Sequence, residues 1–206
     1  MFHVKQREVL PAAPVSRETE CRLRAYLELL LAWNARINLI APATEAVAWD
    51  RHVLDSWQLL PLLPPRGALV DLGSGGGLPG LVLAIGRMEE THLVESDRRK
   101  AAFLREATRL LGLAHVRVHA ERLEAARLPR AVAVTARALA PLQALLREAH
   151  RILAPGGVAV FPKGRTAEDE LTAAAPGWFM RVERFASRTD ADATIFRFSE
   201  IRPAGA

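Results

Sequence analysis

The spacing of apolar residues predicts that the first third of the chain is helical. Several apolar side chains recur at three- and four-residue intervals and would share one helix face: Leu23, Tyr26, Leu27, Leu30 and Trp33. Ser16 stands at the position of an N-cap, with Glu18 and Glu20 near the positive end of the helix. A second helical stretch is predicted from about Glu45 to Leu60, because prolines at positions 61, 64 and 65 follow it.

Beyond these prolines, short apolar runs alternate with segments of helical periodicity. The runs typical of buried strands are Ala68–Asp71, Thr91–Glu95, Val116–His119, Ala131–Thr135 and Val158–Phe161. Helices are predicted over Arg99–Leu111 and Pro141–Leu153, because each segment ends at glycine or proline. Strands separated by helices form parallel sheets with right-handed crossovers, so the pattern predicts a doubly wound α/β fold. Phe179–Phe185 and Thr194–Phe198 flank a turn and predict a closing antiparallel hairpin.

The proline cluster and Gly67 mark the predicted domain boundary. We expect residues 1–66 to form an N-terminal helical extension packed on the core, and residues 67–206 to form the α/β domain. The chain has 206 residues, of which 50% are apolar, which is enough for a substantial core. No apolar run reaches the roughly 18 residues of a membrane span, and residues 1–14 lack the apolar stretch of a secretory signal. The expectation is a soluble, cytoplasmic protein.

Charge and cysteine content narrow the chemistry further. The formal net charge is +5 and the pI is about 10.3, mostly from arginine, whose planar fork pairs with phosphates and with the guanine edge. This excess fits either nucleic-acid contact or a solvated basic surface. Cys21 is the single cysteine, so an internal disulfide and a cysteine-based zinc site are excluded. The histidines lack metal-ligand spacing, and no metal is expected.

The most conspicuous motif is the glycine-rich loop that follows the first predicted strand. It runs from Asp71 to Gly80 and leads into a helix, so its backbone can approach a ligand closely. Gly75, Gly77 and Gly80 have the spacing of a dinucleotide-binding loop, but that spacing alone is weak evidence. Asp71 would repel a pyrophosphate and suits the cationic amino-acid moiety of S-adenosylmethionine. Glu95, at the end of the next strand, is placed to accept hydrogen bonds from ribose hydroxyls.

Six further segments, in order along nearly the whole chain, resemble one family. They are Trp33–Leu39, Arg51–Ser56, Asp71–Gly80, Arg99–Arg105, Ala136–Ala140 and Phe161–Gly164. The chain is similar to the bacterial small-subunit ribosomal RNA guanine-N7 methyltransferases, also called glucose-inhibited division protein B. The resemblance implies a Rossmann-like class I methyltransferase fold: a mostly parallel seven-stranded sheet with a C-terminal antiparallel hairpin and an N-terminal helical extension. It also implies methyl transfer from S-adenosyl-L-methionine to N7 of one guanosine in 16S ribosomal RNA.

The resemblance also implies positions for the site. The family's cofactor pocket maps onto Gly73, Leu78, Leu123, Glu124 and Arg137, to which the loop adds Asp71, Gly75 and Gly77, and the end of the next strand adds Glu95. Arg137 and Lys163 are expected to hold the target nucleotide or its phosphates, with Asn38, His52 and Asp55 shaping the pocket from the N-terminal helices. The expected partner is 16S ribosomal RNA or the small ribosomal subunit, bound by a monomer.

Other interpretations stay open at this point. The chain could methylate another RNA, a protein or a small molecule, could be an NAD-binding oxidoreductase, or could bind RNA without catalysis. The site residues also have structural alternatives. Asn38, His52 and Asp55 could cap helices and tie the N-terminal extension to the sheet, and Arg137 could be an ion-pair partner only.

Overall fold

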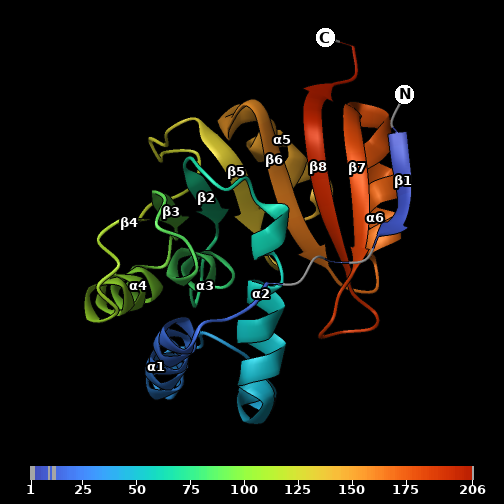
Figure 1. Ribbon diagram of the computed structural model, residues 1–206. Coiled ribbons are helices and arrows are strands. Elements are labelled where there is room, and N and C mark those ends of the chain that lie inside the picture. Colours follow the sequence, from blue (N-terminus) through green and yellow to red (C-terminus); the bar gives the residue numbers. More distant parts are fainter. Residues whose placement is uncertain (1–2, 9, 11–12, 206) are drawn as a thin grey trace.

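The computed structural model describes residues 3–8 (by their backbone), 10 and 13–205, and it forms one twisted sheet with helices on both faces (Figure 1). The strand order is β1-β7-β8-β6-β5-β2-β3-β4. The five strands β2 to β6 are all parallel to one another. Strand β8 is antiparallel to both of its neighbours, β6 and β7. The strands are β1 (His3–Glu8), β2 (Leu69–Leu72), β3 (Thr91–Val94), β4 (Val116–His119), β5 (Ala131–Ala136), β6 (Leu153–Lys163), β7 (Trp178–Ala186) and β8 (Thr194–Pro203).

The seven strands predicted from the sequence are present, and the hairpin of β7 and β8 closes the sheet as expected. The eighth strand, β1, pairs in parallel with β7 at the edge of the sheet and was not predicted. Its sequence, HVKQRE, is mostly polar and has no apolar alternation. An edge strand is paired on one side only and tolerates such a sequence, so periodicity alone does not detect it.

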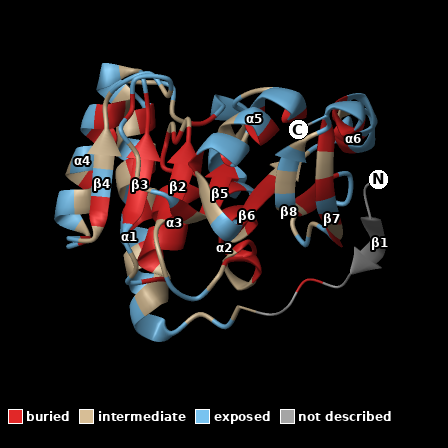
Figure 2. Cartoon of the chain, turned by 90° about the horizontal axis from the view of Figure 1, so that it is seen from above, coloured by how far each residue is buried: buried red, intermediate tan, exposed pale blue. Residues whose placement is uncertain are grey.

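Helices from different parts of the chain cover the two faces, as the view along the sheet in Figure 2 shows. One face carries α1 (Arg17–Asn34), α3 (Gly80–Ile85) and α4 (Arg98–Leu110), and the other carries α5 (Leu142–Ile152) and α6 (Ala167–Ala174), which a short turn, η4 (Ala175–Gly177), follows. Strand β2 is buried throughout, because its alternate side chains enter both layers of the core. No helix in the described part of the chain has the length and apolar character needed to cross a bilayer.

Helix α1 begins as the sequence predicts. The hydroxyl of Ser16 accepts a hydrogen bond from the Thr19 N–H at 3.1 Å. The predicted stripe faces inward, and Leu23, Tyr26 and Leu30 are fully buried against α3 and α4. This packing places α1 beside the glycine-rich loop.

The division of the chain into an N-terminal extension and an α/β domain at residue 66 stays a prediction.

The helical stretch predicted from about Glu45 to Leu60 is present, but it is not one continuous α-helix. The segment is helical but consists of four short pieces of different pitch: η1 (Pro42–Val47, 3₁₀), η2 (Trp49–Leu54, π), α2 (Asp55–Trp57) and η3 (Leu60–Leu62, 3₁₀). In the π turn the Asp55 N–H donates to the Asp50 carbonyl, five residues earlier. Apolar spacing predicts helical winding, but tertiary contacts decide which carbonyl each N–H meets.

Candidate active site

The glycine-rich loop joins β2 to α3 at the carboxyl end of the parallel strands, where ligands bind in open α/β sheets. Its backbone requires glycine at three positions, because φ is +63° at Gly73, +54° at Gly75 and +86° at Gly77. L-residues rarely adopt these conformations. The loop can therefore turn sharply and expose backbone atoms to the space above β2.

Three neighbouring elements hold this loop. From α1, the fully buried Tyr26 hydroxyl donates to the Gly76 carbonyl at 2.5 Å. From β3, the Val94 carbonyl accepts from the Ser74 N–H at 3.0 Å. Just beyond β3, the Glu95 carboxylate accepts from the Gly75 N–H at 2.8 Å through one oxygen and from the Asp97 N–H at 2.8 Å through the other. Glu95 thus orients the loop directly, and each oxygen keeps a lone pair for a further donor.

Asp71 lies beneath the loop and is fully buried. It does not line the cavity that opens beside the loop. Its Oδ1 accepts from the Thr135 hydroxyl at 2.7 Å, whereas Oδ2 has no hydrogen-bond partner among the described residues. Burial raises the pKa of Asp71 to about 6, although the Thr135 hydrogen bond acts in the opposite direction. Burying a carboxylate with one oxygen unpaired costs folding free energy. The charge of Asp71 gives the region beneath the glycine-rich loop a negative potential.

A cavity of about 370 Å³ opens beside the loop. Its lining includes three of the predicted cofactor positions, Gly73, Leu123 and Glu124, together with Val94 and Leu139. A volume of this size is in the range of small-ligand sites, which are about 300–1,000 Å³. Of the other predicted positions, Leu78 is buried in the core beside α1, and Gly75 and Gly77 shape the loop without lining this cavity.

The composition of the cavity distinguishes between possible ligands. Apolar side chains offer surface to a flat heterocycle, and the lining carries the carboxylates of Glu121, Glu124 and Glu148 beside the guanidiniums of Arg122 and Arg147. Of these, Glu148 is paired with Arg151 at 2.8 Å. Carboxylates favour hydroxyl donors and a cationic ligand and disfavour a pyrophosphate. The apolar surface and the carboxylates present fit S-adenosylmethionine, which carries an adenosine, a sulfonium and an ammonium group.

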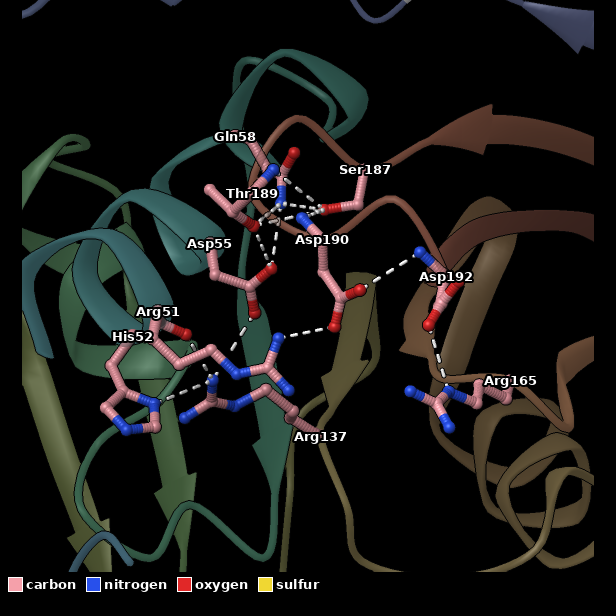
Figure 3. A network of polar contacts seen from close by, with 10 residues as sticks. All are labelled: Arg51, His52, Asp55, Gln58, Arg137, Arg165, Ser187, Thr189, Asp190 and Asp192. Atoms are coloured by element: carbon pink, nitrogen blue, oxygen red, sulfur yellow. Dashed lines mark hydrogen bonds and ion pairs between the residues drawn. The ribbon is translucent and has the colours of Figure 1, made fainter. Parts of the chain in front are cut away.

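Arg137 follows β5 and meets the N-terminal helical pieces there (Figure 3). Its Nη1 donates to Asp55 Oδ2 at 3.3 Å and to His52 Nδ1 at 3.3 Å. The Asp55 Oδ1 accepts from the Thr189 hydroxyl at 2.7 Å and from Gln58 Nε2 at 2.9 Å. Three predicted site residues, Arg137, His52 and Asp55, are thus brought together across more than 80 positions of sequence.

The hydrogen bonds of His52 fix its tautomer. The Thr44 hydroxyl donates to the Ala41 carbonyl at 2.7 Å, so its oxygen accepts from His52 Nε2–H at 2.8 Å. The His52 Nδ1 then accepts from Arg137, and a proton on Nδ1 would meet the guanidinium. Burial and the charge of Arg137 lower the pKa of His52 to about 4, against the weaker opposing effect of Asp55.

This pKa predicts the sign of a pH dependence. Between about 6.5 and 4 the unfolded chain binds a proton at His52 and the folded chain does not, so the stability that neutral His52 provides is lost as pH falls through this range. The free energy of unfolding of the wild-type protein relative to His52→Gln should be highest above pH 6.5 and should fall as the pH is lowered towards 4. Urea unfolding at several pH values measures it. The opposite effect of Asp71, whose pKa is raised, cancels in the difference. A difference that does not change with pH would contradict the assignment.

Lys163 lies apart from the Arg137 cluster. Its ammonium donates to the Ala140 carbonyl at 2.9 Å and to Glu170 Oε2 at 2.8 Å, and the same Glu170 oxygen accepts from the Leu142 N–H at 2.8 Å. Burial would raise the pKa of Glu170, but the Lys163 and Leu142 hydrogen bonds hold it below its usual value. These contacts fix the segment that leads from Arg137 into α5. Direct contact of Lys163 with a nucleotide stays a prediction.

Asn38 is exposed, and its neighbour in the motif carries the structural contacts. Asn34 is buried, and its Oδ1 accepts from the Leu39 N–H at 2.8 Å and from the Ile40 N–H at 2.9 Å. The segment so folded packs against the glycine-rich loop, where a Cβ on Gly76 would lie 3.4 Å from Leu39 Cβ. Asn38 therefore lies on a loop adjacent to the site, free to meet a ligand from solvent.

Sequence reasoning missed several residues that build the site. Thr135, Gln58 and Thr189 hold Asp71 and Asp55, and Leu139 lies over Gly73 with 44% of its surface exposed. The hydroxyls of Thr135 and Thr189 give no local signal of partners 64 and 134 positions away. In the described residues, no group of three or more His, Cys, Asp or Glu side chains is arranged to hold a metal ion.

Comparison with known proteins identifies the family. The profile of the GidB family, described as rRNA small subunit methyltransferase G, matches residues 19–193. A curated relative named Ribosomal RNA small subunit methyltransferase G from Rhodospirillum centenum is 59% identical over 93% of this chain and 88% of its own length. Another with the same name, from Granulibacter bethesdensis, is 54% identical over 98% and 99%.

Solved structures support the fold. An O-methyltransferase from Bacillus cereus in complex with SAH has a TM-score of 0.57 at 14% identity and covers 87% of this chain and 91% of its own. Precorrin-6y C5,15-methyltransferase from Geobacter metallireducens has a TM-score of 0.52 at 16% identity, covering 79% and 91%. This likeness confirms the predicted Rossmann-like class I methyltransferase fold. With the family profile matching most of its length, and with relatives more than half identical along nearly all of it, the chain belongs to the rRNA small subunit methyltransferase G family.

Proposed function

We propose that this protein transfers a methyl group from S-adenosyl-L-methionine to N7 of a specific guanosine in 16S ribosomal RNA. The observation that carries the proposal is the family match, because the relatives named for a small-subunit RNA methyltransferase align over nearly the whole chain. The cavity beside the glycine-rich loop supports it, since its apolar surface and carboxylates suit the adenosine and the cationic groups of this cofactor.

The chemistry requires positioning more than acid–base catalysis. Guanine N7 has an in-plane lone pair and carries no proton, so no base is needed to generate the nucleophile. When bound, the cofactor supplies an electrophilic methyl group on a sulfonium. The contribution of the chain is to hold the two reactants in line, to exclude water and to stabilise shifting charge.

The residues divide these tasks. Glu95 and the loop from Gly73 to Gly77 would receive the ribose and the amino-acid moiety of the cofactor, and Leu123 and Glu124 would receive its adenine. The negative potential of Asp71 beneath the loop favours the cationic cofactor over its neutral-sulfur product. Arg137, one-fifth exposed at the end of β5, would bind the target nucleotide or the cofactor carboxylate.

We further propose that the partner is 16S ribosomal RNA or the small ribosomal subunit, that the protein acts as a monomer, and that it works in the cytoplasm. The arginine-rich composition and the net charge of +5 support RNA contact. Binding that rests on phosphate contacts should weaken steeply with added salt, in contrast to a small-molecule or protein substrate.

Two measurements on purified protein test the proposal. Calorimetry should show that S-adenosylhomocysteine binds and that NAD does not. Transfer of labelled methyl groups to small ribosomal subunits or free 16S RNA from cells lacking the protein should appear at guanine N7. Tight binding of NAD would favour an oxidoreductase, and cofactor binding without any transfer would favour another substrate.

A further inference from the structure

The guanidinium of Arg137 is held along one edge only. All of its hydrogen bonds to the described residues use Nη1, which donates to Asp55 Oδ2, His52 Nδ1 and, at 3.5 Å, the Arg51 carbonyl. An arginine has five N–H donors in a planar fork. The Nε–H and the two Nη2–H groups, here called the Nε–Nη2 edge, have no hydrogen bond among the described residues. That edge has the geometry that binds a carboxylate or a phosphate through two parallel hydrogen bonds.

The carboxylate of Asp55 is oriented independently of Arg137. Its Oδ1 accepts from the Thr189 hydroxyl in the β7–β8 turn and from the Gln58 amide. Gln58 is fixed in turn, because its Oε1 accepts from the Arg188 N–H at 2.8 Å. With Oδ1 engaged in this way, Oδ2 is the oxygen that faces Arg137, and only 13% of the Asp55 side chain is exposed. Figure 3 shows this chain of contacts running from the turn through Asp55 to Arg137.

A long arginine side chain at the end of a strand has many rotamers, and most would not present the Nε–Nη2 edge in one direction. The contact with His52 does not by itself select one rotamer of Arg137, since the neutral His52 ring offers a single hydrogen-bond acceptor and no charge. A buried carboxylate with one committed oxygen supplies both charge and direction. The alternative use of Asp55, as a cap of the short helix that it begins, is not observed, because the donors to its carboxylate among the described residues are the side chains of Gln58, Arg137 and Thr189.

We infer that Asp55, oriented by Thr189 and Gln58, is a positioning residue that holds Arg137 through Nη1 and so presents its Nε–Nη2 edge to the reactants. The inference rests on the proposed function for the identity of the reactants, and it makes the β7–β8 turn part of the site. The side-chain contacts of Asp55 join it to Arg137 on one side and to Thr189 and Gln58 on the other. Its effect on methyl transfer must therefore pass through Arg137.

A double-mutant cycle tests this directly. Asp55→Asn keeps the shape of the side chain and an acceptor for Thr189, but it loses the charge that attracts Nη1. We expect kcat/KM for small ribosomal subunits to fall about 10- to 100-fold, as for a displaced catalytic group. In the Arg137→Ala background, Asp55→Asn should cause no further loss. A loss of equal size in both backgrounds would overturn the inference, as would wild-type activity of the single variant.

A second series separates positioning from a structural role. Thr189→Val removes the donor to Asp55 without touching Arg137 and should lower kcat/KM about 3- to 10-fold, and Thr189→Ser should restore it because it keeps the hydroxyl. Thermal unfolding of each variant reports folding separately. If Thr189→Val loses stability but keeps kcat/KM per folded molecule, the turn is structural only and the inference fails.

Failure of the proposed function would give a different pattern. In that case wild-type protein would not methylate small subunits, whatever the variants do. The double-mutant cycle is then measured with the affinity for S-adenosylhomocysteine in place of kcat/KM. Asp55→Asn should lower this affinity in the wild-type background and should have no effect in the Arg137→Ala background. If Arg137 contacts the RNA and not the cofactor, the affinity for S-adenosylhomocysteine should be the same in all variants, while the wild-type protein still transfers methyl groups. In that case the double-mutant cycle in kcat/KM tests the positioning role of Asp55.

Discussion

Replacing Gly80 by alanine is expected to lower the free energy of unfolding by about 3 kcal/mol, the upper part of the usual range for overpacking. A Cβ at Gly80 would lie 2.5 Å from Asp71 Oδ2, 2.6 Å from Asp71 Cβ and 2.6 Å from Leu93 Cδ2. Asp71 and Leu93 are both fully buried, so neither can move away easily. Helix α3 would have to shift from β2, and the loop that it anchors would move with it. Urea unfolding measures the loss, and calorimetry with S-adenosylhomocysteine should show weakened binding.

Two glycine variants serve as matched controls for Gly80→Ala. Gly164 has no atom within 4 Å of an added Cβ and an ordinary φ, so Gly164→Ala should leave stability nearly unchanged. At Gly75 an added Cβ would make only an ordinary contact, 3.8 Å from the Gly73 carbonyl oxygen, but φ is +54°, so Gly75→Ala should cost about 1 kcal/mol from backbone strain alone. Equal effects at all three positions would show that the close approach of α3 to β2 is unimportant.

Removing the side chain of Arg137 is expected to have the largest effect on activity. Arg137→Ala should lower kcat for methyl transfer about 100- to 1,000-fold, comparable with the loss of a directed donor in other enzymes. The variant should still fold, although its unpaired Asp55 carboxylate will cost some stability. Single-turnover transfer to small ribosomal subunits, with RNA binding measured in parallel, checks the prediction.

The matched control for this variant is Arg109→Ala. Arg109 lies on the exposed side of α4, where it pairs with Glu106, and it contacts no residue of the site. It removes the same charge from the molecule and should retain wild-type transfer. Full transfer and full RNA affinity in Arg137→Ala would show that Arg137 has only a structural role.

Periodicity predicted most of the fold because the elements that it detects are buried on a regular face. The strand β2 and the helix α1 both fall in this class, and so does the hairpin of β7 and β8. Strand β1 was not predicted, because a strand at the edge of a sheet can pair without apolar residues. The helical stretch predicted from about Glu45 to Leu60 is present as short pieces of 3₁₀, π and α winding, a division that apolar spacing does not reveal.

The site was predictable where the backbone dictates residue type. Gly75 and Gly77 have positive φ, and Gly80 packs against Asp71, which are the physical reasons for the glycine spacing. The roles of single side chains were harder to predict. Asp71 supports the loop from below, and Lys163 holds the Ala140 carbonyl, which a strand-end position does not reveal. Hydrogen-bond partners distant in sequence decide such roles.

The central claim is tested most directly by mapping N7-methylguanosine along 16S ribosomal RNA from cells that lack this protein. Cleavage at N7-methylated positions, read by primer extension, locates the modification to one nucleotide. The account predicts that one N7-methylguanosine disappears, and that a wild-type copy restores it whereas an Arg137→Ala copy does not. N7 methylation unchanged at every guanosine in the cells without the protein would contradict the account.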